Sequence, residues 1–182
     1  MRKIKAILLD RDGTLIEDKN YTYKVEDFEI LPGVIEGLKI LNEHFLFFII
    51  TNQSGIGRGY YTEKDFHRFN EHLINYLEGF NLKIEETYFC PHIKEMNCDC
   101  RKPKTKFIDL IQLRYNIDLK SSWMIGDHPS DIEFGINSGC RTVYLTSGHG
   151  DKHLQELKVK HIRPTLILDN FLKAATKIVQ LI

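Results

Sequence analysis

The chain has 182 residues, enough for one domain with a substantial core but too few for two full domains. Hydrophobic residues make up 42% and charged residues 27%, which is the composition of an ordinary soluble globular protein. Lysine plus arginine and aspartate plus glutamate both number 25, so the formal net charge is zero and no overall field favours nucleic acid or an anionic membrane as a partner.

The N-terminal residues do not match a targeting signal. Basic residues precede a short apolar run, but this run ends at Asp10, too soon for the core of a signal peptide. No stretch approaches the length of a membrane span. We therefore expect a cytoplasmic protein with no membrane partner, and the lack of a coiled-coil pattern leads us to expect a monomer.

Short apolar runs and amphipathic helical patterns alternate along the chain. The apolar runs are residues 5–9, 45–50, 123–125, 142–145 and 166–168. Runs this short and this apolar are typical of parallel strands that are buried on both faces.

Helical patterns fill the intervals between these runs. The predicted helices cover residues 32–43, 62–80 with a capping box at Thr62, 105–115, a segment from Pro129 to a stop at Gly139, and a last segment capped by Asp169. This alternation predicts an α/β fold: a single Rossmann-like, three-layer domain over residues 1–182 with a central parallel sheet.

The first chemical motif is Asp10-Arg11-Asp12-Gly13-Thr14, directly after the first predicted strand. The carboxyl end of a strand in such a sheet is where ligands bind. One carboxylate can attack a phosphorus centre while the other handles protons, and Gly13 permits a tight turn behind them. Asp and Gly are also common in plain solvated turns, so this motif alone leaves that alternative open.

Three further motifs carry polar groups. Thr51 and Asn52 follow the second predicted strand, Arg101 and Lys102 form a cationic pair, and a Gly-Asp-His-Pro-Ser-Asp string supplies the carboxylates Asp127 and Asp131. Hydroxyl, amide and cationic groups can hold phosphoryl oxygens. Each motif also has an ordinary structural explanation, since such residues cap helices and solvate surfaces.

Three of the four cysteines lie close together with a histidine. Cys90, His92, Cys98 and Cys100 give the pattern C-x-H-x₅-C-x-C, while Cys140 stands apart. Three thiolates and one imidazole match a closed, four-ligand structural zinc site. We therefore predict a Zn²⁺-stabilised loop over residues 90–100 that fixes Arg101 and Lys102 beside the active site.

Taken in order, the four motifs resemble those of the haloacid dehalogenase superfamily of phosphohydrolases. The resemblance implies a phosphatase and covers nearly the whole chain, from Asp10 to about Leu168. About 30 residues separate Gly13 from the second predicted strand, too few for the large cap domain that some members insert there. We therefore expect an open site whose loops recognise the substrate.

The resemblance also implies a role for each motif residue. Asp10 would be the nucleophile that forms an aspartyl-phosphate, and Asp12 the general acid and then the general base. Mg²⁺ would be bound by Asp10, Asp127 and the main-chain carbonyl of Asp12, with Asp131 supporting them. The residues implied to bind phosphate or substrate are Thr51, Asn52, Arg101 and Lys102.

The zinc pattern followed by Arg-Lys-Pro resembles one group within the superfamily. Its members act on D-glycero-D-manno-heptose 1,7-bisphosphate, in carbohydrate metabolism toward a lipopolysaccharide precursor, or on histidinol phosphate. The string from Thr51 to Gly59 favours the heptose bisphosphate and hydrolysis of its 7-phosphate, whereas the short zinc loop favours histidinol phosphate. Lys106 stands where heptose enzymes commonly have glycine, and neither its role nor that of His128 follows from the sequence.

Two alternatives belong to other functional classes. A phosphatase acting on nucleic-acid ends would have a related fold, but the zero net charge and the lack of a basic stripe argue against it. A non-catalytic zinc-loop scaffold would have no need of Asp10, Asp12, Lys102 and Asp127 together. The sequence therefore predicts an enzyme acting on a small phosphorylated metabolite.

Overall fold

The computed structural model describes residues 3–182, and within this range six strands form one parallel sheet. Residues 1 and 2, which belong to the predicted domain and to the segment tested above as a targeting signal, lie outside the described residues. The strands are β1 (Ala6–Leu9), β2 (Leu46–Asn52), β3 (Ile84–Cys90), β4 (Trp123–Gly126), β5 (Arg141–Leu145) and β6 (Leu166–Leu168). Their order across the sheet is β3-β2-β1-β4-β5-β6.

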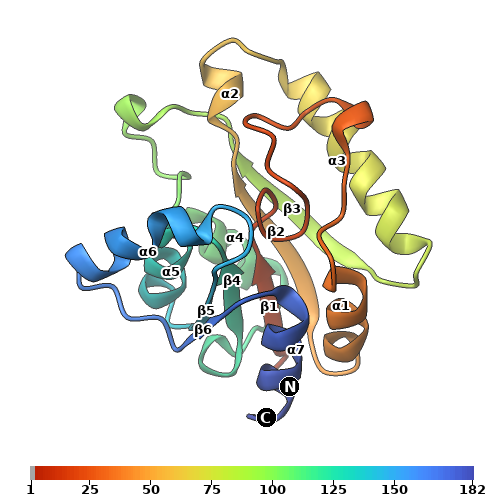
Figure 1. Cartoon of the computed structure of the whole chain (residues 1–182), viewed down its shortest axis with the longest axis vertical. Coiled ribbons are helices and arrows are strands. Elements are labelled where there is room, and N and C mark those ends of the chain that lie inside the picture. Colours follow the sequence, from red (N-terminus) through yellow and green to blue (C-terminus); the bar gives the residue numbers. More distant parts are fainter. Residues whose placement is uncertain (1–2) are drawn as a thin grey trace.

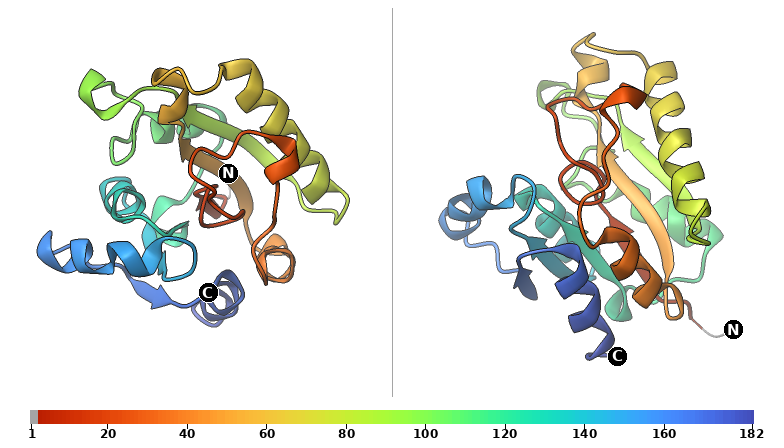
Figure 2. Two further views of the ribbon diagram at one scale, coloured as in Figure 1. Left: turned by 45° about the horizontal axis from the view of Figure 1, so that its top comes forward. Right: turned by 45° about the vertical axis from the view of Figure 1, so that its right-hand side comes forward.

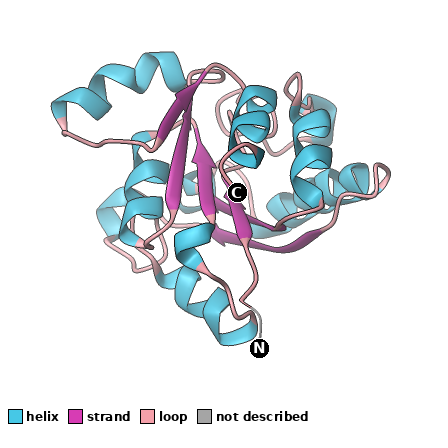
Figure 3. Cartoon of the chain, turned by 90° about the horizontal axis from the view of Figure 1, so that it is seen from below, coloured by secondary structure: helices cyan, strands magenta, loops and turns pink. Residues whose placement is uncertain are grey.

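The helices lie on both faces of this sheet (Figures 1 and 3). They are α1 (Val34–Asn42), α2 (Ser54–Gly57), α3 (Glu63–Glu78), α4 (Lys106–Arg114), α5 (Pro129–Asn137), α6 (Gly150–Val159) and α7 (Phe171–Val179). Short 3₁₀ turns occupy Val25–Asp27, Lys94–Met96 and Leu119–Ser121. The predicted three-layer α/β architecture is therefore confirmed.

The two faces of β1 show why its run of apolar residues is continuous. Ile7 and Leu9 belong to the core cluster under α1, α3 and α7, whereas Ala6 and Leu8 belong to the cluster under α4 and α5. All four side chains are fully buried. Burying apolar surface on both faces supplies the main driving force for assembling the layers.

Helices α1 and α7 lie side by side although they come from opposite ends of the chain (Figure 2, right). Phe171, Ala174 and Ala175 of α7 share a core cluster with Val34 and Leu38 of α1. The ring of Phe171 lies so near Gly37 that a Cβ atom there would come within 2.6 Å of it. A small residue in α1 thus permits the close approach of the two helices.

Helix α6 packs through a smaller third cluster. Leu157 of α6 contacts Ile132 of α5 and Tyr144 of β5 in this cluster.

Within residues 3–182, no helix is both long enough and apolar enough to span a lipid bilayer.

Among the strands and α-helices, the structure differs from the sequence prediction at four elements. Strand β3 and helices α2 and α6 were not predicted, and the last helix is capped by Asn170 instead of Asp169. The Asn170 side chain accepts a hydrogen bond from the backbone N–H of Lys173. The capping box at Thr62 and the start of a helix at Pro129 are confirmed.

Candidate active site

The predicted motifs meet at the point where the strand order reverses. The chain runs from β1 outward through β2 to β3, and then from β4 outward through β5 to β6. Ligands bind beyond the carboxyl ends of the strands at such a switch point. Asp10 follows β1 there. Its backbone N–H donates a hydrogen bond of 3.0 Å to the carbonyl of Ile125 in β4, and Asp127 follows the end of β4. In Figure 1 this end of the sheet is opposite the chain termini.

One open cavity of about 170 Å³ contains the predicted chemical residues. Its lining includes all of the predicted catalytic, phosphate-binding and magnesium-binding side chains, namely Asp10, Asp12, Thr51, Asn52, Arg101, Lys102, Asp127 and Asp131. Residues that lie up to 121 positions apart in the chain are thus brought to one place. The segment between Gly13 and β2 holds a 3₁₀ turn and α1, in agreement with the expectation of no large cap.

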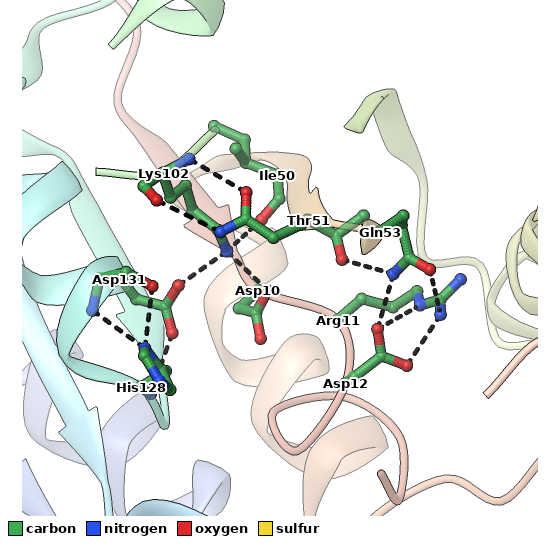
Figure 4. A network of polar contacts seen from close by, with 11 residues as sticks. Asp10, Arg11, Asp12, Ile50, Thr51, Gln53, Lys102, His128 and Asp131 are labelled. Carbon is green, nitrogen blue, oxygen red and sulfur yellow. Dashed lines mark hydrogen bonds and ion pairs between the residues drawn. The ribbon is translucent and has the colours of Figure 1, made fainter. Parts of the chain in front are cut away.

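Lys102 lies at the centre of the cavity's charged groups (Figure 4). Its Nζ atom is 2.6 Å from Oδ1 of Asp10, 2.7 Å from Oδ1 of Asp131 and 2.6 Å from the carbonyl oxygen of Ile50. The ammonium group has three hydrogens, and these three acceptors use all of them. The lysine side chain is buried, so its position is fixed by these contacts.

Asn52 holds the backbone of Lys102. Its side-chain Oδ1 accepts a hydrogen bond from the Lys102 N–H at 3.0 Å, and its Nδ2 donates to the Lys102 carbonyl at 3.3 Å. This pair of bonds fastens the loop that carries the lysine to the end of β2. Asn52, which was predicted to bind phosphate, thus positions the backbone of a cationic residue in this structure.

Two carboxyl groups of the cavity, those of Asp10 and Asp127, have raised pKa values. Burial raises the pKa of Asp10 to about 7 against the opposing effect of Lys102. Burial, reinforced by the charges of Asp10 and Asp131, raises the pKa of Asp127 to about 8. Ligand atoms of Asp10, Asp127 and Asp131 lie within 4.8 Å of one another. Clustered carboxylate oxygens are the donors that Mg²⁺ prefers.

Two glycines allow the backbone to approach Asp127 closely. Gly13 has φ +79°, and a Cβ atom on it would lie 2.1 Å from Oδ2 of Asp127. Gly148 has φ +61°, and its Cβ would lie 2.8 Å from the same oxygen. Both the left-handed backbone and the lack of space require glycine at these positions. The loops after β1 and β5 thereby enclose this carboxylate.

Asp12 is held by two residues that sequence reasoning did not assign to the site. Arg11 donates from Nη2 to Oδ1 of Asp12 at 2.8 Å and from Nε to Oδ2 at 3.0 Å, a bidentate pair. Gln53 donates from Nε2 to Oδ2 of Asp12 at 2.8 Å and to Oγ1 of Thr51 at 2.8 Å. The guanidinium group of Arg11 is buried over the rings of Phe66 and Phe69.

The cysteine cluster forms a compact set of metal donors. The sulfur of Cys90 lies 3.2 Å from that of Cys100 and 3.5 Å from that of Cys98, and Nδ1 of His92 lies 3.3 Å from the Cys100 sulfur. A tetrahedral zinc ion with bonds of about 2.3 Å places its sulfur ligands about 3.8 Å apart. The sulfurs are too far apart for disulfide bonds, whose length is about 2.05 Å. The residues present thus fit a zinc ion.

The three thiols are not equivalent. Burial raises the pKa of Cys90 and of Cys100. Burial also opposes ionisation of Cys98, but hydrogen bonds from Cys90 and from backbone amides outweigh it and lower the pKa of Cys98 to about 6. A thiolate is the form that binds metal, so Cys98 is the thiol most prepared for it.

The cysteine cluster lies immediately before the site lysine. Cys100 belongs to the core cluster under α4, and Arg101 donates from Nη1 to the carbonyl of His92 at 3.3 Å. Lys102 follows at once. The loop therefore has two anchors on either side of Arg101, the sulfur cluster and the Asn52 contacts, and Arg101 itself lines the cavity.

Several cavity residues were missed because their contacts depend on the fold. Asp18, Ser130, His149 and His153 also line the cavity, together with His128, whose role the sequence left open. The backbone N–H of His149 bonds to Oδ2 of Asp127 at 2.9 Å, and Nδ1 of His149 lies 3.3 Å from Oδ2 of Asp18. No motif spacing indicated these contacts, since His149 precedes and His153 lies on α6, a helix that was not predicted.

Comparison with known proteins agrees with this geometry. Residues 99–174 match the family model described as HAD-hydrolase-like. The chain is 41% identical over 146 residues to the D-glycero-alpha-D-manno-heptose-1,7-bisphosphate 7-phosphatase of Campylobacter jejuni, covering 80% of this chain and 84% of that protein. It is 46% identical over 145 residues to a D-glycero-beta-D-manno-heptose-1,7-bisphosphate 7-phosphatase of Helicobacter pylori, covering 78% and 82%.

A solved structure has the same fold over its whole length. It is the D,D-heptose 1,7-bisphosphate phosphatase of B. bronchiseptica in complex with magnesium and phosphate, with a TM-score of 0.88, 25% identity and coverage of 98% of this chain and 100% of that one. The sheet order, the arrangement of motifs at its switch point and these sequence identities lead to one assignment. The chain belongs to the haloacid dehalogenase-like family of phosphatases, in the group that contains these heptose-bisphosphate enzymes.

Proposed function

We propose that this chain is a magnesium-dependent heptose-1,7-bisphosphate 7-phosphatase that works through an aspartyl-phosphate on Asp10. The observation that carries the proposal is the meeting of Asp10, Asp12, Lys102 and Asp127 in one cavity of a chain 41% identical to a phosphatase of that name. The enzyme class and the fold are those of its family. The roles of the individual residues below are our proposal.

Asp10, Asp127 and the main-chain carbonyl of Asp12 would hold Mg²⁺, and Asp131 would support them. The clustered oxygen donors and the raised pKa values of Asp10 and Asp127 fit a divalent cation, because added positive charge favours the ionised carboxylates. When bound, the ion offsets the repulsion between an anionic nucleophile and a phosphate dianion. Lys102 contributes a second positive charge at the same place.

Asp10 acts as the nucleophile in this proposal. The oxygen that Lys102 does not hold attacks the phosphorus atom, a new bond forms between that oxygen and phosphorus, and the bond from phosphorus to the sugar oxygen breaks. Thr51 binds the transferring phosphoryl group, and the charge of Lys102 reduces the repulsion between that group and the Asp10 carboxylate. A water molecule then attacks the aspartyl-phosphate, the bond from Asp10 to phosphorus breaks, and inorganic phosphate leaves with the Asp10 carboxylate restored.

Asp12 moves the protons of both steps. It gives its proton to the departing sugar oxygen in the first step and accepts a proton from the attacking water in the second. Arg11 and Gln53 donate hydrogen bonds to the carboxyl oxygens of Asp12, so they orient this side chain. This arrangement matches the base role, and the acid role requires Asp12 to turn toward the substrate with its proton.

A bisphosphate substrate would explain why a second cationic side chain, that of Arg101, lines the cavity beside Lys102. The departing oxygen must face Asp12, and Arg101 lines the same cavity. We therefore assign Arg101 to the distant 1-phosphate, which its planar fork can bind through two hydrogen bonds. Histidinol phosphate carries a cationic amine, and a second cation beside it would be unfavourable.

Cys90, His92, Cys98 and Cys100 would hold a structural zinc ion in this proposal. Four protein ligands leave no open position for catalysis. The ion would fold a loop that carries few apolar residues and would keep Arg101 and Lys102 beside Asp10. Its contribution is therefore to the geometry of the site.

The decisive experiment compares kcat/KM for three substrates in the presence of Mg²⁺. These are the alpha and the beta anomer of heptose 1,7-bisphosphate, since relatives with both names match this chain, and histidinol phosphate, which the short zinc loop favoured. Either heptose anomer should be preferred over histidinol phosphate. A preference for histidinol phosphate would overturn the substrate assignment, and no phosphate release from any of the three would overturn the proposed function.

A further inference from the structure

Beside the active-site cavity lies a second group of metal-binding side chains that the proposed mechanism does not use. His128 caps the start of α5, while His153 and Glu156 are three positions apart on α6. One ligand atom of each lies within 4.8 Å of the others. The rings of His128 and His153 meet edge to face with their centres 4.5 Å apart. The set therefore joins two helices through three donors.

The other polar atoms of these residues are already held in ways that orient the donors. Lys160 pairs with Oε1 of Glu156 at 2.7 Å, which leaves Oε2 facing Nδ1 of His153 at 3.4 Å. Nδ1 of His128 lies 2.9 Å from Oγ of Ser130. Contacts of this kind fix the rings and carboxylates that bind metals.

We propose that His128, His153 and Glu156 bind one transition-metal ion of the zinc, cobalt or nickel type. Two imidazoles and one carboxylate suit such ions, whereas Mg²⁺ prefers oxygen ligands and does not compete well for this set. Three protein ligands leave open coordination positions. The side chains of His153 and Glu156 are 34% and 35% exposed, so an ion can reach them from solvent.

The place of this site gives it a consequence for substrate binding. His128 and His153 line the active-site cavity, and His128 and Glu156 line an adjoining cavity of about 370 Å³. An ion on these three residues occupies the junction of the two cavities. The ion, with the water molecules at its open positions, obstructs the approach of the substrate to Asp10, so it acts as an inhibitor that competes with the substrate. Metal binding at this site does not depend on the proposed function. The inference that the ion competes with the substrate rests on the proposed function.

Cobalt binding tests the site directly. The chain is purified with zinc retained in the cysteine cluster, and Co²⁺ is titrated in excess Mg²⁺, which keeps the aspartate cluster occupied. We expect one further Co²⁺ per chain, with a weak visible spectrum typical of nitrogen and oxygen ligands. Cobalt that entered the cysteine cluster would instead give intense absorption from the thiolates, so the two locations are distinguishable.

Variants assign the ion to these residues. His153→Gln and Glu156→Gln should each weaken Co²⁺ binding at least about tenfold. The matched control is His44→Gln, an exposed histidine in the turn between α1 and β2, at the other end of the strands. Equal binding by the wild type and both site variants, or no additional Co²⁺ in the wild type, would overturn the proposal.

Inhibition tests the consequence separately. Micromolar Zn²⁺ should raise the KM for p-nitrophenyl phosphate in the wild type while leaving kcat nearly constant, and each site variant should be less sensitive relative to its own activity without zinc. If the ion binds and KM does not rise, the competition is refuted. A chain that binds Co²⁺ but releases no phosphate from any substrate would refute the proposed function and leave the metal site standing.

Discussion

The ammonium group of Lys102 lies 2.6 Å from Oδ1 of Asp10, although the two residues are 92 positions apart in the chain. The pair is buried, and Asp131 contacts the same ammonium group at 2.7 Å. Breaking one partner of a buried pair is costly because the other charge is left uncompensated. The geometry of Asp10, the proposed nucleophile, is therefore coupled to that of the loop after the cysteine cluster.

Asp10→Asn should lower kcat at least about a thousandfold because a neutral amide cannot attack phosphorus. The fold should persist, since Asp131 still pairs with Lys102. Phosphate release and thermal unfolding followed by circular dichroism measure the two effects. Asp109→Asn, an exposed carboxylate on α4, is the matched control. Near wild-type turnover by Asp10→Asn would rule out the aspartyl-phosphate.

Arg11→Lys should lower kcat about 10- to 100-fold, because lysine keeps the charge but cannot form the bidentate pair that orients Asp12. The loss should be larger for a sugar phosphate than for p-nitrophenyl phosphate, whose departing group needs little help from an acid. Arg68→Lys alters an exposed arginine and serves as control. Equal losses for both substrates would mean that Arg11 does not act through the proton transfer of Asp12.

Gly13→Ala should weaken Mg²⁺ binding and destabilise the fold, because the added Cβ would lie 2.1 Å from Oδ2 of Asp127. Gly59→Ala is the matched control, since Gly59 has a similar φ of +74° with no heavy atom within 4 Å of an added Cβ. The control should cost about 1 kcal/mol of unfolding free energy from backbone strain alone. Urea unfolding and the Mg²⁺ dependence of activity separate the two variants. A similar Mg²⁺ dependence in both would refute the steric argument.

One zinc ion per chain should be found by elemental analysis of protein purified without added metal. Cys98→Ser should lower the zinc content and loosen the loop from Cys90 to Lys102. Cys140→Ser should keep its zinc, because Cys140 is buried outside the cluster, where burial raises the pKa of its thiol to about 12. A disulfide between Cys90 and Cys100, or between Cys98 and Cys100, in freshly prepared reduced protein would exclude the site.

Arg101→Ala should lower kcat/KM for heptose 1,7-bisphosphate. The loss of transition-state stabilisation should be about 1.5–3 kcal/mol if Arg101 makes a charged hydrogen bond to the 1-phosphate. The effect on a monophosphate should be smaller. Arg163→Ala, which removes an exposed arginine away from the cavity, is the control. The same loss on mono- and bisphosphates would show that Arg101 does not recognise the second phosphate.

Much of the fold could be predicted because the central strands are buried on both faces. β1 and β4 consist of fully buried side chains, and such runs stand out in the sequence. Strand β3 was missed because it lies at the edge of the sheet and contains Glu85, Glu86 and Thr87, so its side chains are mostly half-buried. β3 therefore carries no continuous apolar run, whereas β6 at the other edge is the apolar run Leu166–Leu168 and was predicted.

The site could be predicted where function resides in short motifs at strand ends. Asp10, Asp12 and Asp127 lie within a few residues of a strand whose end the pattern marks. The supporting contacts could not be predicted, since Arg11 reaches Gln53 and the carbonyl of Thr22 through the fold. His149 reaches Asp127 in the same way, through a glycine-dependent loop. These partners depend on three-dimensional placement that local spacing does not encode.

The central position of β1 has a consequence for synthesis on the ribosome. One edge of β1 pairs with β2, which follows it closely, but the other edge pairs with β4, which begins at Trp123. An apolar strand edge therefore stays unpaired while more than a hundred further residues are made. Exposed edges of this kind invite wrong pairing between nascent chains. We expect the pairing of β1 with β4 to form late, after β4 has emerged. The packing of α7 against α1 should form later still.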